Sequence, residues 1–391
     1  MKILILSFYY QPDLCAGSFR CSALVQSLLS NRSSADTIEI ITTVPNRYDS
    51  YSSEAPESEK HEGLSIYRVR LPSHQSGMLD QSKAFLQYAR KVRSLVRGNQ
   101  YDLVYATSSR LLTAALGAYV VRNNTTPLYL DIRDIFVDTI KDVLPKKLAI
   151  GAKPIFDVLE RWTINKASKV NLVSKGFQSY FEDKYPKQEF SYFTNGIDSI
   201  FLNCVVDSVG QRCDSDMPIS ILYAGNFGEG QGLHNIVPLL AKKLGNRVHF
   251  HLIGDGGRRK QLENELIKLD CSNVAILPPI KRDDLLTEYQ RADVLFLHLN
   301  DYDAFRKVLP SKIFEYAALG KPILAGVSGY AAEFVEKEIS NAKVFHPCNI
   351  EEAELALLSL KLGTEPRNEF IEKFSRSNIM KQMADDICNM L

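Results

Sequence analysis

The sequence predicts an α/β protein made of two doubly wound, Rossmann-like domains, each with a parallel sheet. Apolar, β-rich runs alternate with helical patterns along the whole chain, which is typical of βαβ units with helices on both faces of a sheet. The length of 391 residues favours two domains or more. A polar, aperiodic stretch at residues 203–217 divides the chain into two halves and predicts an interdomain linker.

Each expected strand is a short apolar run, and a helical pattern usually follows it. In the first half, the expected strands are residues 2–8, 37–43, 64–69, 102–106, 128–132 and 169–173. The expected helices of that half are residues 17–30, 81–97, 109–122, 151–167 and 175–184. The first apolar run has no cleavage site after it, so it predicts a buried strand rather than a signal peptide.

The second half repeats this pattern. Its expected strands are residues 219–224, 247–253, 273–278, 293–298, 322–325 and 342–346. Its expected helices are residues 231–244, 257–269, 282–291, 310–319, 330–337 and 350–362. The expected domains are therefore residues 1–202 and 218–364, and the final segment, residues 365–391, predicts a charged amphipathic helix.

Composition and charge exclude several classes of protein. Hydrophobic residues make up 45% of the chain and charged residues 24%, which is ordinary for a globular domain, and the net charge of +1 gives no general attraction to nucleic acid. No run reaches the ~18 apolar residues that would cross a membrane. The seven cysteines lack CxxC spacing and indicate reduced thiols. We therefore expect the chain in the cytoplasm, or at most on the membrane surface.

The segment from Pro310 to Gly326 is the most informative part of the chain. Pro-Ser begins a predicted helix, a Gly ends it, and a short apolar strand follows. The free N–H groups at a helix N-terminus suit a phosphate, and Lys312 adds positive charge. Glu315, one turn further on, can accept hydrogen bonds from sugar hydroxyls. The pattern predicts a nucleotide-sugar site, and its alternative is an ordinary amphipathic helix before a buried strand.

This segment resembles the donor-site signature of retaining glycosyltransferases of family 4, which have the GT-B fold. The resemblance extends over nearly the whole chain. It implies that Ser311, Lys312, Ile313 and Glu315 bind a nucleotide-sugar donor in a cleft between the two domains. It also implies that the last helix crosses back onto the N-terminal domain.

The loop after the first strand contains Gly17, and Arg20 follows one turn inside the next helix. It looks like the family's first loop, which brings backbone close to the donor diphosphate and the acceptor. Gly17 permits such an approach because it has no Cβ, and Arg20 is within reach of a phosphate in this interpretation. Relatives often carry two glycines here, whereas this chain has Ala16-Gly17. The alternative is a loop glycine beside a solvated arginine.

Arg133 and Asp134 follow the strand at residues 128–132, at its carboxyl edge. Charges at that edge face the cleft, since burying them unpaired would be costly. A similar Arg-Asp pair replaces a His in a subgroup of family 4. The resemblance implies that Asp134 contacts sugar hydroxyls and that Arg133 orients it or touches phosphate. The alternative is a structural ion pair at a strand end.

The second domain opens with a strand, a glycine loop and a helix, which is a phosphate-cradling arrangement. Its candidate donor contacts are Gly225, Asn226 and Gln231, and Gly254 lies in a further Gly-Asp-Gly turn. The common family pattern has Arg and Lys where Asn226 and Gln231 stand. We expect Lys312, and Arg306 or Lys307, to compensate the diphosphate charge instead. The alternative for the loop is a flexible segment without a ligand.

Two further features bear on the donor and on metals. Lys307 occupies the position of the first Glu in the family's two-glutamate motif, a departure shared with other members that carry Pro-Ser-Lys. No metal is expected, because His249 and His251 lack an acidic or Cys partner at ligand spacing and GT-B enzymes characteristically work without one. The only small molecule expected is a UDP-sugar co-substrate.

Basic residues cluster in two stretches of the N-terminal half. They are Arg68, Arg70, Lys83, Arg90, Lys91, Arg93 and Arg97, then Lys146, Lys147, Lys153, Arg161 and Lys166 beside Trp162. Such residues contribute roughly 1 kcal/mol each near an anionic leaflet. They predict contact with the cytoplasmic face of the inner membrane and a lipid-linked acceptor. The alternative is a solvated basic face.

The resemblance implies a metal-independent, retaining glycosyltransferase. We expect it to move a hexose or N-acetylhexosamine from a UDP-sugar to a glycan or a polyprenyl-diphosphate-linked acceptor in bacterial surface polysaccharide synthesis, such as O-antigen or capsule. A nucleotide-sugar epimerase on the same fold is a second hypothesis, but it needs acid and base residues that the sequence does not offer convincingly. A non-catalytic nucleotide-sugar-binding subunit is a third, which the missing Arg, Lys and first Glu permit.

Overall fold

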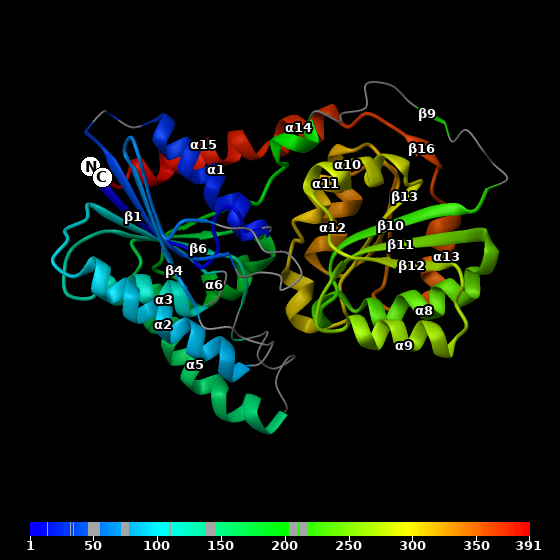
Figure 1. Ribbon diagram of the computed structural model, residues 1–391, viewed down its shortest axis with the longest axis horizontal. Helices are drawn as coiled ribbons and strands as arrows, with labels where there is room; N and C mark the ends of the chain where they lie inside the picture. The colour runs from blue at the N-terminus through cyan, green and yellow to red at the C-terminus, as the bar shows by residue number, and fades with distance from the viewer. Residues whose placement is uncertain are drawn as a thin grey trace. The chain divides into compact units, whose positions relative to one another are not determined.

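The computed structural model describes residues 1–13, 15–31, 33, 35–45, 55–71, 78–108, 111–135, 137, 146–202, 210–211 and 217–391. The chain forms two compact units, each drawn with its elements in Figure 1. The first unit comprises Met1–Asn195 together with Arg376–Leu391, and the second comprises Gly196–Ser375. Both ends of the chain therefore belong to the first unit.

The first unit contains an eight-stranded sheet in the order β3-β4-β2-β1-β5-β6-β7-β8. Its strands are β1 (Lys2–Leu6), β2 (Thr37–Thr43), β3 (Ser58–His61), β4 (Leu64–Val69), β5 (Leu103–Thr107), β6 (Leu128–Ile132), β7 (Lys169–Leu172) and β8 (Phe190–Ser191). All neighbours pair in parallel except β3, which joins β4 in antiparallel register at the edge. The prediction missed β3 because its sequence, Ser-Glu-Lys-His, is polar and has no apolar face.

Helices cover both faces of this sheet (Figure 1). They are α1 (Ala16–Ser30), α2 (Met78–Val96), α3 (Leu111–Val120), α5 (Lys146–Lys166), η1 (Lys175–Phe177), α6 (Gln178–Lys184) and α15 (Arg376–Cys388). Helices α1 and α15 pack together on one face, where Met380, Met383 and Ile387 of α15 are completely buried with the inward side chains of β1. The last helix is therefore part of the core of the first unit.

The second unit contains a six-stranded parallel sheet in the order β12-β11-β10-β13-β14-β15. Its strands are β10 (Ile219–Asn226), β11 (Val248–Asp255), β12 (Val274–Leu277), β13 (Val294–His298), β14 (Ile323–Gly326) and β15 (Ala342–Phe345). A separate antiparallel pair joins β9 (Gly210–Gln211) to β16 (Gly363–Thr364). In both sheets the strand order reverses beside the first strand, at β1 and at β10, where ligand sites of doubly wound sheets lie.

Two helical layers enclose the second sheet (Figure 1). The helices are α7 (Ser199–Leu202), η2 (Glu229–Gln231), α8 (Leu233–Leu244), η3 (Gly245–Arg247), α9 (Arg259–Lys268), α10 (Arg282–Arg291), η4 (Asp303–Lys307), α11 (Lys312–Ala318), α12 (Tyr330–Glu338), α13 (Ile350–Leu358) and α14 (Asn368–Phe374). One core lies under α8, α9 and α13, and the other lies under α10, α11, α12 and α14.

The boundaries between the units differ from the predicted ones. Ile197 and Phe201 are buried in the core of the second unit, so the chain enters that unit at residue 196 and not after residue 202. The polar stretch at residues 203–217 lies within the span of the second unit and is not the connection. Of that stretch, residues 203–209 and 212–216 lie outside the described residues.

The predicted single C-terminal helix is two helices. Helix α14 ends at Phe374, Ser375 is extended with φ −56° and ψ 123°, and α15 begins at Arg376. Phe370 and Phe374 of α14 belong to the core of the second unit, whereas α15 belongs to the first unit. The break separates two apolar faces that serve two different cores.

Candidate functional site

The glycine loop after β10 lies at the carboxyl edge of the second sheet. Gly225 pairs in register with Gly254 of β11, and their backbones are so close that an added Cβ on Gly254 would overlap the Gly225 carbonyl. Asn226 and Gln231 are bonded to each other, with 2.9 Å between Asn226 Nδ2 and Gln231 Oε1. Gln231 Oε1 also accepts from the Gly228 N–H at 3.3 Å. The sequence therefore folds these residues into one tight loop.

The two residues that replace the family's Arg and Lys thus make a neutral pair that shapes the loop. The Nε2 group of Gln231 has no acceptor among the described residues. A ligand can use this group, or the second N–H of Asn226 Nδ2, without breaking the pair. Asn226 and Gln231 remain predicted contacts to the donor, and their hydrogen bond also holds the glycine loop together.

Lys312 lies directly over Gly225. An ideal Cβ at position 225 would be 2.5 Å from Lys312 Cε and 3.1 Å from Nζ, and Gly225 has φ +157°. Only glycine fits both the backbone angle and this approach. Burial lowers the pKa of Lys312, Arg282 lowers it further, and Glu315 opposes the shift. The loop and Lys312 together place a cation at the carboxyl edge of β10.

Glu315 follows Lys312 by one turn of α11, as predicted from the sequence. It is partly exposed, and its carboxylate has no hydrogen-bond donor among the residues that the structure describes. Ser311 is likewise partly exposed and caps α11 without a side-chain hydrogen bond. Both side chains are therefore available to a ligand. Lys307 ends η4 and is half-buried.

The structure corrects the prediction for Ile313. Its side chain is 1% exposed and lies in the core under α11. Its N–H donates to the Pro310 carbonyl at 3.2 Å, so neither group faces a ligand. Arg306 is exposed and lies 3.6 Å from Asp303, which partly neutralises the charge that we expected it to offer a diphosphate.

His298 and Arg282 also belong to this edge of the sheet, and the sequence pattern did not identify either of them. His298 is the last residue of β13 and is 1% exposed. Arg282 begins α10 and pairs with Asp198 at 2.6 Å. One signal could have identified His298: it is a polar residue at the end of an apolar strand, next to β10, where the strand order reverses. Arg282 carried no comparable signal.

The candidate residues of the first unit lie at the carboxyl edges of β1 and β6. Arg133 and Asp134 follow β6, and the Arg133 N–H donates to Ser108 Oγ at 3.1 Å. The Arg133 guanidinium lies against Gly17, where an added Cβ would overlap Nη1. Its Nε is buried without a partner among the described residues. The structure therefore brings Gly17 and Arg133 together, as their motifs predicted for one site.

Asp134 is an exposed residue, yet the surrounding protein atoms desolvate its carboxyl group. This desolvation raises its pKa to about 6, and Arg133 opposes the shift. No partner for its carboxylate is found among the described residues. The group is therefore available to accept hydrogen bonds from a ligand above that pH.

The phosphate role predicted for Arg20 is wrong. Arg20 is 1% exposed and forms a bidentate ion pair with Asp131, with bonds of 2.8 and 2.9 Å. Its remaining donors reach the carbonyls of Thr194 at 2.6 Å and Phe193 at 2.8 Å. The guanidinium is therefore enclosed in the core, where it ties α1 to β6 and to the segment after β8.

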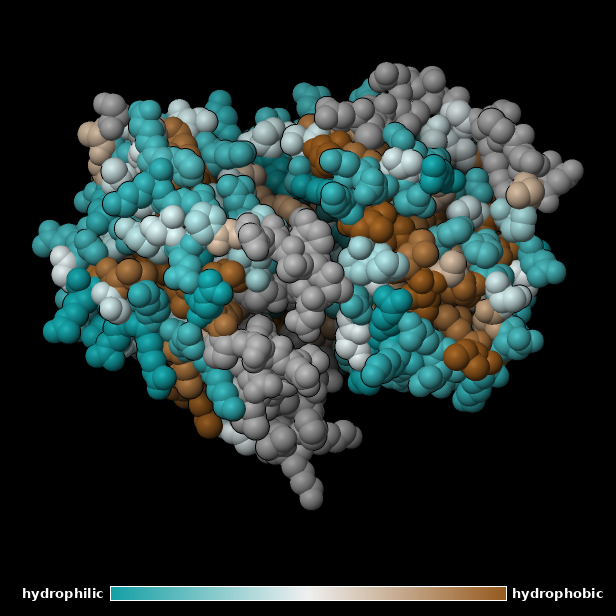
Figure 2. Space-filling view, in the orientation of Figure 1, coloured by the Kyte–Doolittle hydropathy of each residue, from teal (hydrophilic) through white to brown (hydrophobic). Residues whose placement is uncertain are grey.

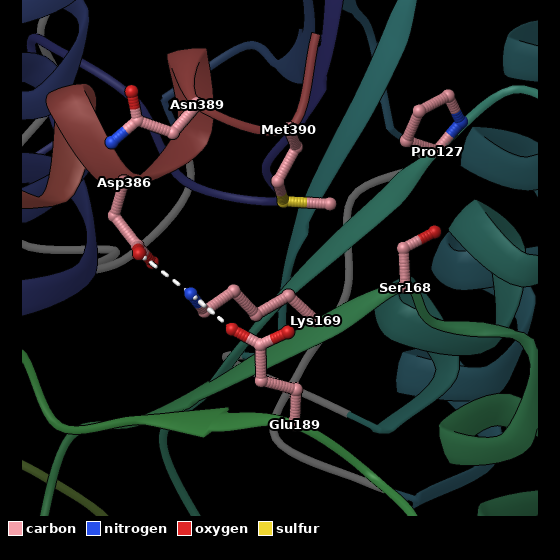
Figure 3. Close-up of a pocket in the computed structure, with 7 residues that line it drawn as sticks. All are labelled: Pro127, Ser168, Lys169, Glu189, Asp386, Asn389 and Met390. Carbon is pink, nitrogen blue, oxygen red and sulfur yellow. Dashed lines mark hydrogen bonds and ion pairs between the residues drawn. The ribbon is translucent and has the colours of Figure 1, made fainter.

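A polar depression of about 530 Å³ lies at the amino ends of β6, β7 and β8, at the edge of the first sheet opposite the candidate residues (Figure 3). Lys169 extends across it between Asp386 at 2.7 Å and Glu189 at 2.6 Å. The two ion pairs join β7 to α15 and to the residue before β8. This depression serves to attach α15, and its charged groups are already paired.

The described part of the chain offers neither a metal cluster nor a membrane span. Among the described residues, no three or more His, Cys, Asp and Glu side chains are grouped so as to hold a metal ion. None of the described helices combines the length and apolarity needed to span a bilayer.

Family models match most of both units. The model described as Glycosyl transferase 4-like domain matches residues 29–196, and the one described as Glycosyl transferases group 1 matches residues 214–376. The chain belongs to the family 4-like glycosyltransferases. WcaI of Escherichia coli (strain K12), named for a glycosyl transferase role in colanic acid biosynthesis, is 24% identical over 73% of this chain and 71% of that protein.

Solved glycosyltransferase structures share the fold of the whole chain. Sucrose-phosphate synthase from Thermosynechococcus elongatus has a TM-score of 0.77 at 12% identity, covering 100% of this chain and 98% of that one. Anabaena HepE, solved in complex with UDP, has a TM-score of 0.66 at 18% identity, covering 100% of both chains. These likenesses confirm the predicted GT-B fold of two Rossmann-like domains.

Proposed function

We propose that this glycosyltransferase is a retaining, metal-independent enzyme that uses a UDP-linked hexose or N-acetylhexosamine. The observation that carries the proposal is the placement of Lys312 over Gly225, with the unbonded Glu315 carboxylate one turn away. A cation against a glycine loop suits a diphosphate, and a carboxylate accepts hydrogen bonds from sugar hydroxyls. The UDP bound in the HepE structure supports uridine as the nucleoside to test first.

The acceptor side of the proposal rests on Gly17, Arg133 and Asp134. The bond between the anomeric carbon and the β-phosphate oxygen breaks, and the acceptor hydroxyl oxygen bonds to that carbon on the same face. The acceptor proton passes to the leaving diphosphate. Asp134 accepts a hydrogen bond from a sugar hydroxyl, and Lys312 offsets the charge that develops on the diphosphate. Retention comes from the family resemblance.

The acceptor class that we propose has support from one relative. WcaI is named for colanic acid biosynthesis, which supports a role for this chain in surface polysaccharide assembly. We propose a glycan or a polyprenyl-diphosphate-linked sugar as its acceptor. The epimerase alternative gains no support, because Asp134 is the only described carboxylate at the first unit's candidate site with a raised pKa. The non-catalytic alternative keeps one supporting observation, the neutral Asn226–Gln231 pair.

A donor screen tests the enzyme. The wild-type chain is incubated with UDP-, GDP-, ADP- and CDP-sugars, with and without polyprenyl-diphosphate acceptors, and nucleotide release is measured. We expect release from a UDP-sugar only with acceptor, and product of the donor's anomeric configuration. Lys312→Met should abolish nucleotide release. Lys321→Met, which replaces a lysine just after α11, is the matched control and should not abolish it. A product with the opposite anomeric configuration to the donor would contradict the retaining mechanism. Nucleotide release without a glycan product would contradict the assignment as a transferase.

The location that we propose is the cytoplasm, with contact at the cytoplasmic face of the inner membrane. Side chains Lys83, Arg90, Lys91, Arg93 and Arg97 are exposed on or just after α2. On α5, Ile155 and Val158 are 69% and 67% exposed. Figure 2 shows hydrophobic atoms among hydrophilic ones in the region where Figure 1 draws these helices. Cations beside exposed apolar side chains suit an anionic bilayer surface.

Some of the predicted basic residues do not contribute to that surface. Arg68 is 5% exposed and pairs with Glu59, so its membrane role is wrong. Arg161 is paired with Asp157 at 3.0 Å. The side chains of Lys146 and Lys147 lie outside the described residues.

Vesicle sedimentation tests the membrane proposal separately from catalysis. We expect the wild-type chain to bind vesicles that contain phosphatidylglycerol and to be released by salt. Replacing Lys83, Arg90 and Lys91 by Glu should weaken binding at least tenfold, and Ile155→Ser should weaken it at constant charge. The matched control is a triple replacement by Glu in the second unit, at Lys242, Lys243 and Lys268, which should leave binding unchanged. Equal binding by all variants would refute this surface.

A further inference from the structure

His298 joins two loops at the carboxyl edge of the second sheet. Its Nδ1 lies 2.7 Å from the Gln231 carbonyl oxygen in the glycine loop. Its Nε2 lies 3.0 Å from the Cys348 backbone nitrogen, in the loop after β15. A carbonyl can only accept and a backbone N–H can only donate, so Nδ1 carries the proton and Nε2 is the acceptor. One neutral imidazole thus spans from the loop after β10 to the loop after β15.

The fold holds the ring in this position. His298 pairs in register with Gly326 of β14, and an added Cβ on Gly326 would overlap the imidazole. The ring stacks with Phe296 at 20° and with Phe345 at 28°, each with centroids 6.0 Å apart. Burial lowers its pKa to about 4, which keeps it neutral at ordinary pH. The aromatic stack alone could be made by a phenylalanine, so the two directed hydrogen bonds are what histidine adds.

Asn300 completes the attachment of the glycine loop. Its backbone N–H donates to the Gly230 carbonyl at 2.9 Å, and its Nδ2 donates to the Glu229 carbonyl at 3.1 Å. With His298, these bonds take up three consecutive carbonyls, those of Glu229, Gly230 and Gln231. Within the loop, the N–H groups of Gln231 and Gly232 donate to the carbonyls of Gly228 and Glu229, so the bonds from His298 and Asn300 hold a closed turn against the end of β13.

We propose that His298 is a positioning residue of the donor site, which sets the orientation of the glycine loop through the Gln231 carbonyl, with Asn300 as its partner. This inference deepens the proposed function and rests on it, since it assigns the loop to the diphosphate of the donor. His298 does not touch the donor. It acts through the loop that bears Gln231 and lies beside Gly225 and Lys312.

The two hydrogen bonds of His298 can be separated by substitution. Asparagine retains a donor near the Nδ1 position and loses the bond to Cys348. Glutamine retains an acceptor near the Nε2 position and loses the bond to Gln231. Phenylalanine retains the stack with Phe296 and Phe345 and loses both bonds. If the bond to Gln231 sets the loop, donor affinity should follow that bond and not the stability of the variants.

The experiment measures the Kd for UDP by calorimetry, the KM for each substrate and the Tm of four proteins. We expect H298F and H298Q to weaken UDP binding about tenfold or more, the size expected when a buried carbonyl loses its donor. H298N should stay within about threefold of the wild type. The acceptor KM should not change in any variant.

A fifth protein protects the test against a folding failure of H298F. Asn300→Asp keeps the size of the side chain but loses the donor to Glu229, and should weaken UDP binding severalfold. Equal UDP affinity in the wild type, H298F and N300D would overturn the inference, as would losses that follow Tm alone. If the wild type itself binds none of UDP, GDP, ADP and CDP, the proposed function fails, and this inference fails with it.

Discussion

Both candidate sites rest on a glycine against which a cation lies. Gly17 faces the Arg133 guanidinium in the first unit, and Gly225 faces the Lys312 side chain in the second. In each case the missing Cβ leaves the space that the cation fills. The cation is thereby held at the end of a strand and close to backbone groups, which suits the recognition of a phosphate or a sugar.

Gly17→Ala tests this arrangement in the first unit. The new Cβ would displace the Arg133 guanidinium, and because that group ends a flexible side chain, we expect little loss of stability. Transfer activity should fall about tenfold or more, since a misplacement near 1 Å can cost 10²-fold. Gly151→Ala is the matched control, because its Cβ would meet nothing within 4 Å. Unchanged activity in G17A would remove Gly17 from the site.

Asp134→Asn tests the raised pKa of Asp134. A carboxyl with a folded-state pKa of about 6 contributes stability that is present at low pH and lost as pH rises through 6. We therefore expect D134N to have a higher Tm than the wild type at pH 8 and an equal Tm near pH 3. Asp36→Asn is a control of opposite sign, because the Met1 amino group lowers the pKa of Asp36 to about 2. A constant Tm difference across pH would contradict the shift.

Lys312→Met tests the cation of the second unit. Since burial lowers the pKa of Lys312, its charge is lost at a lower pH than that of an ordinary lysine. The affinity of the wild type for UDP should therefore fall on the alkaline side, and it should be weaker and independent of pH in K312M. Calorimetric titrations from pH 7 to pH 10 measure both. A pH profile shared by the two proteins would refute the assignment.

At the scale of elements, α15 closes the first unit from the far end of the chain. Arg20 of α1 is held by Asp131 of β6 and lies 3.3 Å from the Met383 sulfur. Asn31 at the end of α1 bonds to Asp385 at 2.7 Å. Lys169 adds its ion pair with Asp386 (Figure 3). Polar bonds at several points thus fix the register of an apolar helix-to-helix contact.

Met380→Ala measures the apolar part of this contact. Met380 is 0% exposed, so its truncation removes buried surface and leaves a cavity. We expect a loss of about 2–5 kcal/mol in the free energy of unfolding. The exposed neighbour Lys381→Ala should change it by no more than about 0.5 kcal/mol. Urea unfolding of both variants decides the matter, and similar small losses would mean that α15 contributes little to the core.

For the whole molecule, the two units differ in how the chain builds them. The second unit is one continuous segment, Gly196–Ser375, whereas the first needs both ends of the chain. The core of the first unit therefore forms only when residues about 350 positions apart meet, which delays it relative to local contacts. The second unit contains all of its own strands and helices.

Removal of residues 376–391 tests this difference. We expect the truncated chain to lose hydrogen-exchange protection in β1, β2 and α1, because the apolar face that α15 covers becomes exposed to water. Protection in β10, β11 and β13 should be retained. Exchange followed by mass spectrometry reports both regions in one experiment. Loss of protection in both units would show that the second one depends on the first.

Local sequence pattern predicts the fold class, most of the apolar strands and the glycine turns that follow β10 and β11, because hydrophobic period and turn residues act over a few positions. It also indicated Lys312 and Glu315, which lie one turn apart on the same helix. Tertiary structure alone decided that Arg20 is buried, since its partner Asp131 is 111 positions away. It likewise decided that Asn226 and Gln231 pair, that His298 spans two loops and that the units divide at residues 195 and 376. Such facts depend on which strand ends meet, and local pattern carries no information about that.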